Sequence, residues 1–225
     1  MWWQRKAVSG SSSVMEEGLL LIISGPAGVG KGSVCKVLCS ENLNLYYSVS
    51  LTTRSPRPGE RDGVNYYFVQ EEQFMQLRDE GFLLEWAMVH GNYYGTPAHR
   101  VEEMRKEGRD VILEIDTEGA RQIRRNTKDG VFVFLLPPTM QDLLKRIHKR
   151  GTDTHAEIQR RFAAAYRELE DLGRYDYAVI NEEIKTAAAH IAAIIIAEKC
   201  RIARCQNVLK RLKEEGDNID LSFTR

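Results

Sequence analysis

The feature that most constrains this chain is an apolar run that leads directly into a glycine-rich turn and then into a helical segment. Residues Leu19–Ile23 are all apolar, and a continuous run of this kind predicts a strand that is buried on both faces. The turn reads Gly25-Pro-Ala-Gly-Val-Gly-Lys31-Gly32-Ser33, and Ser33–Glu41 has a helical pattern. A strand, a glycine-rich turn with lysine and a helix in this order predict a loop that holds phosphate groups.

The chemistry of this turn, the P-loop (Gly25–Ser33), supports a nucleoside triphosphate as ligand. Its glycines allow backbone turns that direct several N–H groups toward one anion, and the helix start adds partial positive charge. Lys31 can reach the β- and γ-phosphates. An ordinary glycine-rich turn would explain the glycines, but it would not explain Gly-Lys before a hydroxyl-bearing helix start. The predicted ATP-binding residues of the loop are Gly25, Pro26, Ala27, Gly28, Val29, Gly30, Lys31, Gly32 and Ser33.

One position departs from the strict pattern, which has Ser or Thr directly after the lysine to hold Mg²⁺. Here Gly32 follows Lys31, and Ser33 comes next. Because Mg²⁺ gives up its waters reluctantly, we expect it to be the cofactor but to bind with ATP, largely through phosphates and water. We expect no metal site made by protein side chains alone.

Length and composition favour one compact α/β domain with smaller inserted subdomains. The chain has 225 residues, of which 43% are apolar and 28% charged, with 32 basic and 32 acidic residues. This balance gives no overall attraction to nucleic acid or to an anionic membrane. No apolar stretch approaches the roughly 20 residues of a membrane span, and residues 1–14 lack the apolar core of a secretory signal. The four cysteines match no zinc pattern, so we expect free thiols and a cytoplasmic protein.

Strands alternate with helices over much of the chain, which predicts a parallel sheet covered by helices on both faces. The segment between Leu51 and Pro97 interrupts this alternation and is interpreted as an inserted subdomain, with a turn at His90–Thr96. From Glu183 onward we expect one long helix that runs into the tail. The other expected strands are Tyr46–Leu51, Tyr66–Val69, Phe82–Val89, Asp110–Ile115, Val131–Leu136 and Tyr177–Ile180; the other expected helices are Glu71–Glu80, Pro97–Glu107, Thr117–Arg125, Thr139–Lys149 and Glu157–Leu172.

A second anion site is predicted in the loop rich in arginine, proline and glycine that precedes Tyr66. Arg54 and Arg57 stand three residues apart in this loop, and together with the tyrosine they can form a fork for a phosphate monoester. Taken alone, the two arginines would equally fit a solvated basic loop.

At this point the chain closely resembles the guanylate kinase family. The matching pieces follow the family order from about Leu19 to Lys199, and they are Gly25–Lys31, Ser50–Arg57, Gly59-Glu60, Gly63 with Tyr66, Glu85-Trp86, Gly91–Thr96, Leu113–Asp116 with Gly119, and Arg150–Thr152. The resemblance implies a P-loop NTPase core with a parallel sheet, a GMP-binding insertion and a helical lid. It also implies transfer of the γ-phosphoryl group of ATP to GMP, and to dGMP.

The resemblance divides the chain into segments. The guanylate kinase-like domain is expected at 18–200, after a flexible extension at 1–17 and before a charged tail at 201–225. Within the domain, the core is expected at 18–49, 98–137 and 162–200, the insertion at 50–97 and the lid at 138–161.

By resemblance, nine residues surround GMP: Ser50, Arg54, Arg57, Tyr66, Glu85, Tyr94, Thr96, Glu114 and Asp116. The chemistry of guanine agrees with this set. Its N1–H and N2–H donors lie side by side, so one carboxylate such as Glu85 can accept both, while Ser50 or Thr96 can donate to O6. Adenine would leave buried polar groups unpaired, a mismatch that discriminates by roughly 10⁴ or more.

The lid is expected to bring arginines to the ATP phosphates. Arg146, Arg150 and Arg161 flank the loop Gly151–Thr154, although such arginines alone would usually mark a solvated helix face. By resemblance, Asn181 contacts adenine, and Lys31, Arg54, Arg150 and Arg161 are the catalytic residues. The acceptor phosphate is already an anion near neutral pH, so no general base is expected. Two polyanions must instead be brought into line by cations.

Two other functions remain open from the sequence. A non-catalytic guanylate-kinase-like module that binds phosphopeptides or proteins would tend to lose the P-loop lysine, which is present here as Lys31. A related small-molecule kinase with another acceptor would not need a carboxylate at Glu85 with the two hydroxyls. The sequence does not decide between a monomer and a homo-oligomer, and it assigns no function to the tail.

Overall fold

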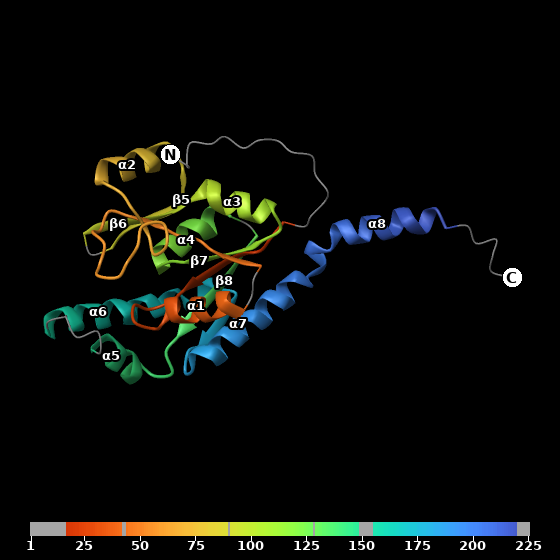
Figure 1. Ribbon diagram of the computed structural model, residues 1–225. Coiled ribbons are helices and arrows are strands. Elements are labelled where there is room, and N and C mark those ends of the chain that lie inside the picture. Colours follow the sequence, from red (N-terminus) through yellow and green to blue (C-terminus); the bar gives the residue numbers. More distant parts are fainter. Residues whose placement is uncertain (1–16, 42–43, 90, 128, 149–154, 220–225) are drawn as a thin grey trace.

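The computed structural model describes residues 17–41, 44–89, 91–127, 129–148 and 155–219, and it contains two β-sheets in that part of the chain (Figure 1). The larger sheet has five strands, and every neighbouring pair is parallel. Its strands, in spatial order, are β2 (Leu45–Tyr47), β7 (Asp110–Glu114), β1 (Leu20–Ser24), β8 (Gly130–Leu136) and β9 (Tyr177–Ile180). The predicted α/β fold with a parallel sheet is confirmed.

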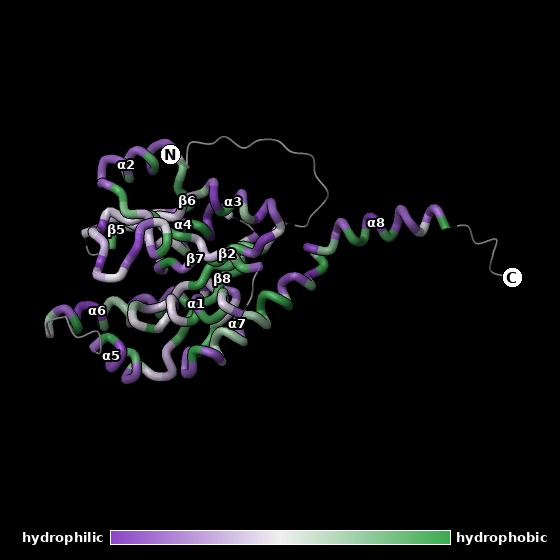
Figure 2. The backbone as a smooth tube through the Cα atoms, viewed as in Figure 1, coloured by the Kyte–Doolittle hydropathy of each residue, from purple (hydrophilic) through white to green (hydrophobic). Residues whose placement is uncertain are grey.

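Strand β1 is buried on both faces, as its uninterrupted apolar sequence predicts. Leu21 and Ile23 belong to a core shared with α1 (Lys31–Glu41) and α7 (Ile184–Lys199). Leu20 and Ile22 point to the opposite face, into a core shared with α3 (Ala98–Lys106) and α4 (Thr117–Asn126). Figure 2 shows these central strands as the hydrophobic interior of the molecule. The sheet therefore fixes the position of the loop that leaves the end of β1.

The smaller sheet lies within residues 51–97 of the chain. Its spatial order is β4 (Tyr67–Phe68), β3 (Leu51–Thr52), β6 (Asn92–Pro97) and β5 (Leu83–Val89). Helix α2 (Glu71–Asp79) packs Phe74 and Leu77 into a separate small core with this sheet. The segment that interrupts the alternation in the sequence thus has a sheet and a core of its own.

One predicted turn is wrong, because most of His90–Thr96 forms strand β6. This strand pairs antiparallel with β5, and the chain reverses at Gly91, whose positive φ of 79° suits a tight turn. Tyr93 explains the extended conformation, since its ring stacks on Phe74 at a centroid distance of 5.4 Å. His90 itself lies outside the described residues.

Three further boundaries differ from the sequence expectation. The strand expected at Tyr46–Leu51 is divided into β2 and β3, which belong to different sheets. The helix expected at Glu157–Leu172 is α6 (His155–Glu168) followed by the 3₁₀ helix η2 (Leu169–Arg174). The long helix from Glu183 ends with α7, because Arg201 takes an extended conformation before the short 3₁₀ helix η3 (Ile202–Arg204) and α8 (Gln206–Asp217).

The remaining helix, α5 (Met140–His148), packs Leu143 and Ile147 into the core that contains α1 and α7. In the described part of the chain, no helix has both the length and the apolar character needed to cross a membrane. The four cysteines are free, and no disulfide links them.

Candidate active site

The P-loop connects β1 to α1 at the carboxyl end of the parallel sheet. Gly25, Gly28 and Gly30 have φ values of 140°, 91° and 99°, which other residues adopt only with strain. A Cβ at Gly25 would also lie 2.3 Å from the Leu135 carbonyl oxygen. Lys31 folds back over the loop, and its Nζ donates to the Gly25 carbonyl oxygen at 2.5 Å. The loop is therefore shaped by glycine positions that a side chain would disrupt.

Two residues from outside the loop hold its Val29 carbonyl in place. Asn181, which follows β9, donates from Nδ2 to that oxygen at 2.7 Å, and Arg146 of α5 donates to it from Nη1 at 3.2 Å. Arg146 also donates from Nη2 to the Asn181 carbonyl oxygen at 2.9 Å. Asn181 is only 2% exposed, and its buried Oδ1 has no hydrogen-bond partner among the described residues. Both residues thus brace the P-loop.

A cleft of about 470 Å³ opens between the P-loop and the smaller sheet. It brings together ten of the residues that the sequence assigned to the two nucleotides and to catalysis, although they come from segments far apart in the chain. Lys31 lies on its P-loop wall, and Glu85 of β5 lies on the wall formed by the smaller sheet. The other predicted residues that line it are Gly25, Ala27, Ser50, Tyr66, Tyr94, Glu114, Asp116 and Arg161.

Glu85 is a buried carboxylate with one strong hydrogen bond. It is 5% exposed, and its Oε1 accepts a bond from the Thr96 hydroxyl of β6 at 2.6 Å. Burial raises the pKa of Glu85 to about 7, and Asp116 adds to this increase while the bond from Thr96 opposes it. The other oxygen, Oε2, lies against α4, where a Cβ at Gly119 would be only 2.4 Å away. The absence of a side chain at Gly119 therefore makes room for this carboxylate.

Two more carboxylates stand at the end of β7. Glu114 Oε2 accepts a hydrogen bond of 2.5 Å from the Tyr47 hydroxyl, and burial followed by the Glu114 charge raises the pKa of Tyr47. A Cβ at Gly32 would lie 3.1 Å from a Glu114 oxygen, so this glycine lets the carboxylate approach the start of α1. Asp116 caps α4 by accepting from the Gly119 N–H at 2.8 Å.

Arg54 is held in a fixed orientation beside the cleft. Its Nη2 donates to both oxygens of Glu60 at 3.0 Å, and its Nε donates to the Tyr94 hydroxyl at 3.3 Å. The guanidinium carbon lies 5.5 Å from the centre of the Tyr66 ring. Arg54, Tyr66 and Tyr94 therefore form one group whose cation faces two phenol side chains.

Some predicted residues lie elsewhere. Ser33 and Arg57 are exposed and do not line the cleft, and Arg150 lies outside the described residues. Arg161 reaches the cleft from α6, as does Glu168, which the sequence reasoning missed. Burial raises the pKa of Glu168, with Asp116 and Asp171 contributing and Lys31 opposing.

The partners of the predicted residues were also missed. The Tyr47 hydroxyl donates to the Glu114 carboxylate, and the Glu60 carboxylate accepts from Arg54. Glu60 belongs to a matching motif that gave it no role, whereas no motif includes Tyr47, whose partner Glu114 is 67 positions away. No cluster of three or more His, Cys, Asp or Glu among the described residues could hold a metal ion.

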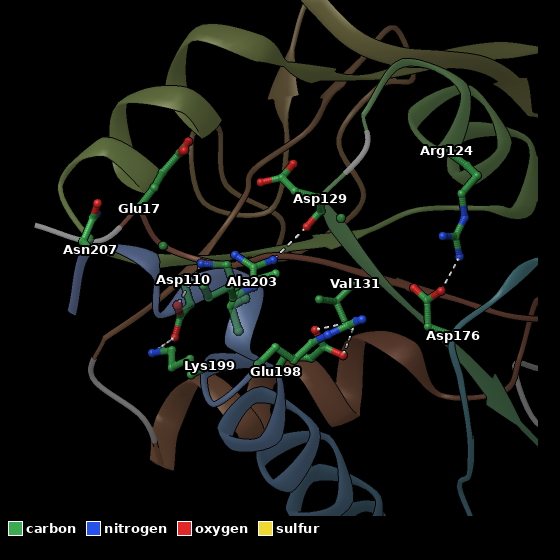
Figure 3. Close-up of a pocket in the computed structure, with 16 residues that line it drawn as sticks. Glu17, Asp110, Arg124, Asp129, Val131, Asp176, Glu198, Lys199, Ala203 and Asn207 are labelled. Atoms are coloured by element: carbon green, nitrogen blue, oxygen red, sulfur yellow. Dashed lines mark hydrogen bonds and ion pairs between the residues drawn. The ribbon is translucent and has the colours of Figure 1, made fainter. Parts of the chain in front are cut away.

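A larger cleft, of about 700 Å³, lies at the opposite edge of the main sheet, beside the amino ends of β1 and β8 (Figure 3). Its charged side chains pair with one another, as Arg124 does with Asp176 and Lys199 with Asp110. It contains neither a glycine-rich loop nor the buried carboxylate Glu85, so its size does not make it the better candidate for a nucleotide site.

Comparisons with known proteins identify a family for the whole domain. Residues 17–198 match the family model described as "Guanylate kinase". A guanylate kinase of Caldanaerobacter subterraneus subsp. tengcongensis is 48% identical over 204 residues, which cover 91% of this chain and 99% of the relative. One of Clostridium tetani is 50% identical over 200 residues, 89% of this chain and 96% of the relative. The crystal structure of a guanylate kinase from Anaplasma phagocytophilum superposes with a TM-score of 0.71 at 33% identity, covering 84% of this chain and 90% of that chain.

Proposed function

This chain belongs to the guanylate kinase family, and from that premise we propose that the cleft between Lys31 and Glu85 is where it binds its two nucleotides and transfers a phosphoryl group between them. The chain is an ATP:GMP phosphotransferase, whose substrates are ATP and GMP and whose products are ADP and GDP. The observation that carries the assignment of the site is that a P-loop lysine and a buried acceptor of purine donors line one cavity.

We place guanine against Glu85. A carboxylate can accept the N1–H and N2–H of guanine together, whereas adenine presents a lone pair at N1. Thr96 already donates its hydroxyl to Glu85, so the Ser50 hydroxyl, which lines the same cleft, is the better placed donor to O6. The ribose plays no part in this recognition, which supports dGMP as a second acceptor.

The 5′-phosphate of GMP is assigned to the group of Arg54, Tyr66 and Tyr94, with Arg57 joining from the exposed loop. Arg54 is held by Glu60 in the structure, so its guanidinium is oriented before the substrate arrives. The phenol hydroxyls supply hydrogen bonds of moderate strength beside this cation. Glu114 and Asp116 lie at the carboxyl end of β7, where α/β proteins bind ligands, and we assign them to the remaining polar groups of GMP.

ATP is assigned to the P-loop, with its phosphates along the backbone N–H groups of residues 25–33 and near Lys31. The unpartnered Oδ1 of Asn181 is the acceptor available for the amino group of adenine. Arg161 faces the cleft from the proposed lid, and we place Arg146 and Arg150 with the ATP phosphates.

We propose Mg²⁺ as the cofactor. When bound with ATP, it neutralises charge on the β- and γ-phosphates. The oxygens of Glu114 beside Gly32, and of Asp116 in the cleft, suit contact with the waters of the ion.

The chain's own contribution to the reaction is positioning and charge. Lys31 and the arginines offset the repulsion between two polyanions, and the in-line approach of the GMP phosphate to the γ-phosphate requires no protein base. We propose that the insertion (50–97) and the lid (138–161) close on the core (18–49, 98–137 and 162–200) and exclude water that would hydrolyse ATP. The four free thiols are consistent with a cytoplasmic enzyme.

A coupled assay of ADP formation tests this assignment, with GMP, dGMP, AMP, UMP and CMP as acceptors in the presence of Mg²⁺. We expect rapid ADP formation with GMP and dGMP and little with the other three. Efficient use of a pyrimidine or of AMP would contradict the placement of guanine at Glu85. ADP formation with none of the five would contradict the catalytic role of the cleft altogether.

A further inference from the structure

Helix α8 (Gln206–Asp217) extends away from the rest of the described molecule (Figure 1). None of its residues is buried, and only Val208 is even partly covered. Isolated helices shorter than about 12–15 residues are only marginally stable in water. A twelve-residue helix that buries no residue against the described part of the chain therefore calls for a partner.

The end of α7 and the short helix η3, which precede α8, are attached to the core by ion pairs and hydrogen bonds. These contacts direct α8 away from the core. Lys199 Nζ at the end of α7 lies 2.5 Å from Asp110 Oδ2, and Arg204 of η3 donates to the Asp129 carbonyl oxygen at 2.9 Å. The Tyr177 hydroxyl donates to Glu198 at 2.6 Å. Figure 3 shows Asp110, Lys199 and Glu198 at the larger cleft. The pairs hold η3 against the amino edge of the main sheet and leave α8 free beyond it.

Apolar and small residues recur through this segment at alternating intervals of three and four residues, the spacing of a coiled coil. Three of them lie in α8, namely Leu209, Leu212 and Gly216; Ile202 lies in η3, and Cys205 and Ile219 flank α8. Leu209 is 41% exposed and Leu212 is 54% exposed, although both are leucines in a regular helix. We call this row the α8 seam. In Figure 2, α8 carries hydrophobic as well as hydrophilic stretches, in contrast to a uniformly solvated helix.

The charges of α8 are separated along its length. Lys210, Arg211 and Lys213 come first, and Glu214, Glu215 and Asp217 follow. Two such helices placed antiparallel bring the basic half of one to the acidic half of the other, whereas a parallel pair would bring like charges together. The equal number of acidic and basic residues also disfavours an anionic membrane, which attracts helices with a basic polar face.

We propose that the α8 seam packs antiparallel against the α8 seam of a second copy of this chain, which makes the protein a two-fold symmetric dimer. The same surface is self-complementary in both apolar pattern and charge, as a two-fold contact requires. The contact lies at the edge of the sheet opposite the P-loop cleft, so each chain keeps a complete active site.

Light scattering coupled to size-exclusion chromatography tests this proposal over the micromolar range of protein concentration. Wild-type protein should show a mass twice the 25.7 kDa of one chain. Leu209→Glu and Leu212→Glu, singly and together, should return the mass to that of one chain. Asn207→Glu adds the same charge to α8 away from the seam, and it should remain dimeric.

Three results would overturn the proposal. The first is a monomeric wild-type protein throughout this range. The second is a dimer that both leucine variants leave intact, and the third is a dimer that is lost when residues 1–16 are removed while α8 is unchanged. GMP-dependent ADP formation per chain should stay within twofold of wild type in both leucine variants. That readout separates loss of the dimer from loss of the fold, and it is independent of the assignment of the nucleotide site.

Discussion

Glu85 on β5 and Thr96 on β6 stand directly opposite each other in the hairpin, and the Thr96 hydroxyl donates to the Glu85 carboxylate at 2.6 Å. This pair places a carboxylate that is almost fully buried at one wall of the cleft, and Lys31 lies on the other wall. A buried acid with so few partners costs stability when it is ionised. It is retained, in this account, because guanine supplies the missing donors.

The cost of ionising Glu85 should appear in the pH dependence of stability. Its pKa is about 7 in the folded chain and about 4.5 when unfolded, so between these values the folded state binds more protons. The free energy of unfolding should therefore fall as pH rises from about 4.5 to 7, by roughly 3 kcal/mol from this group. Glu85→Gln should lack this contribution. Urea unfolding of both proteins across this range, without nucleotide, measures the difference, which should grow with pH; a constant difference would contradict the raised pKa.

Gly119→Ala should weaken GMP binding, although alanine normally favours a helix. The new Cβ would lie 2.4 Å from Glu85 Oε2 and 3.4 Å from Asp116 Oδ1, so the carboxylate must move. We expect KM for GMP to rise about tenfold, equivalent to about 1.4 kcal/mol, with KM for ATP little changed. Gly173→Ala, where a Cβ would meet nothing within 4 Å, is the matched control and should leave both constants unaltered.

Asn181→Asp should impair the ATP side of the site alone. The substitution is nearly isosteric, but it replaces the Nδ2 donor to the Val29 carbonyl by an oxygen. A buried acceptor facing another acceptor costs about 1–3 kcal/mol, and the P-loop should lose its shape accordingly. Steady-state kinetics should show KM for ATP increased about tenfold or more, and KM for GMP unchanged. Asn126→Asp at the exposed end of α4 serves as the control, and equal effects of the two variants would refute the bracing role.

Lys31→Ala should slow turnover by roughly 10²–10³-fold, because it removes the cation nearest to the transferred group. Lys36→Ala removes a lysine from the exposed side of the same helix, and its turnover should match wild type. Circular dichroism should show both variants folded. A Lys31→Ala enzyme with nearly normal turnover would mean that the P-loop lysine does not act in catalysis.

The sequence predicted the core of this protein well, for a physical reason. Leu19–Ile23 must be buried on both faces, and the glycines that follow have few uses other than the backbone turns they make here. Glu85 was assigned by the resemblance to the guanylate kinase family, and the chemistry of guanine agrees with that assignment. In each case the chemistry of a short stretch of residues limits the structure it can adopt.

What the sequence could not show depends on contacts between distant segments. Strand β6 was missed because the segment His90–Thr96 was interpreted as a turn that carries aromatic residues. The stacking of Tyr93 on Phe74, which favours an extended chain there, is visible only in the structure. The bonds from Tyr47 to Glu114 and from Asn181 to Val29 join residues 67 and 152 positions apart. The ion pair of Lys199 with Asp110, at the end of α7, likewise joins residues far apart in the sequence.

The claim that Glu85 selects the purine is tested most directly by the ratio of kcat/KM for GMP to that for AMP, measured for wild type and for Glu85→Gln. We expect the wild-type ratio to be roughly 10⁴ or more, and the variant ratio to be lower by about 10², because glutamine cannot accept both guanine donors. An unchanged ratio in a folded, active variant would contradict the account.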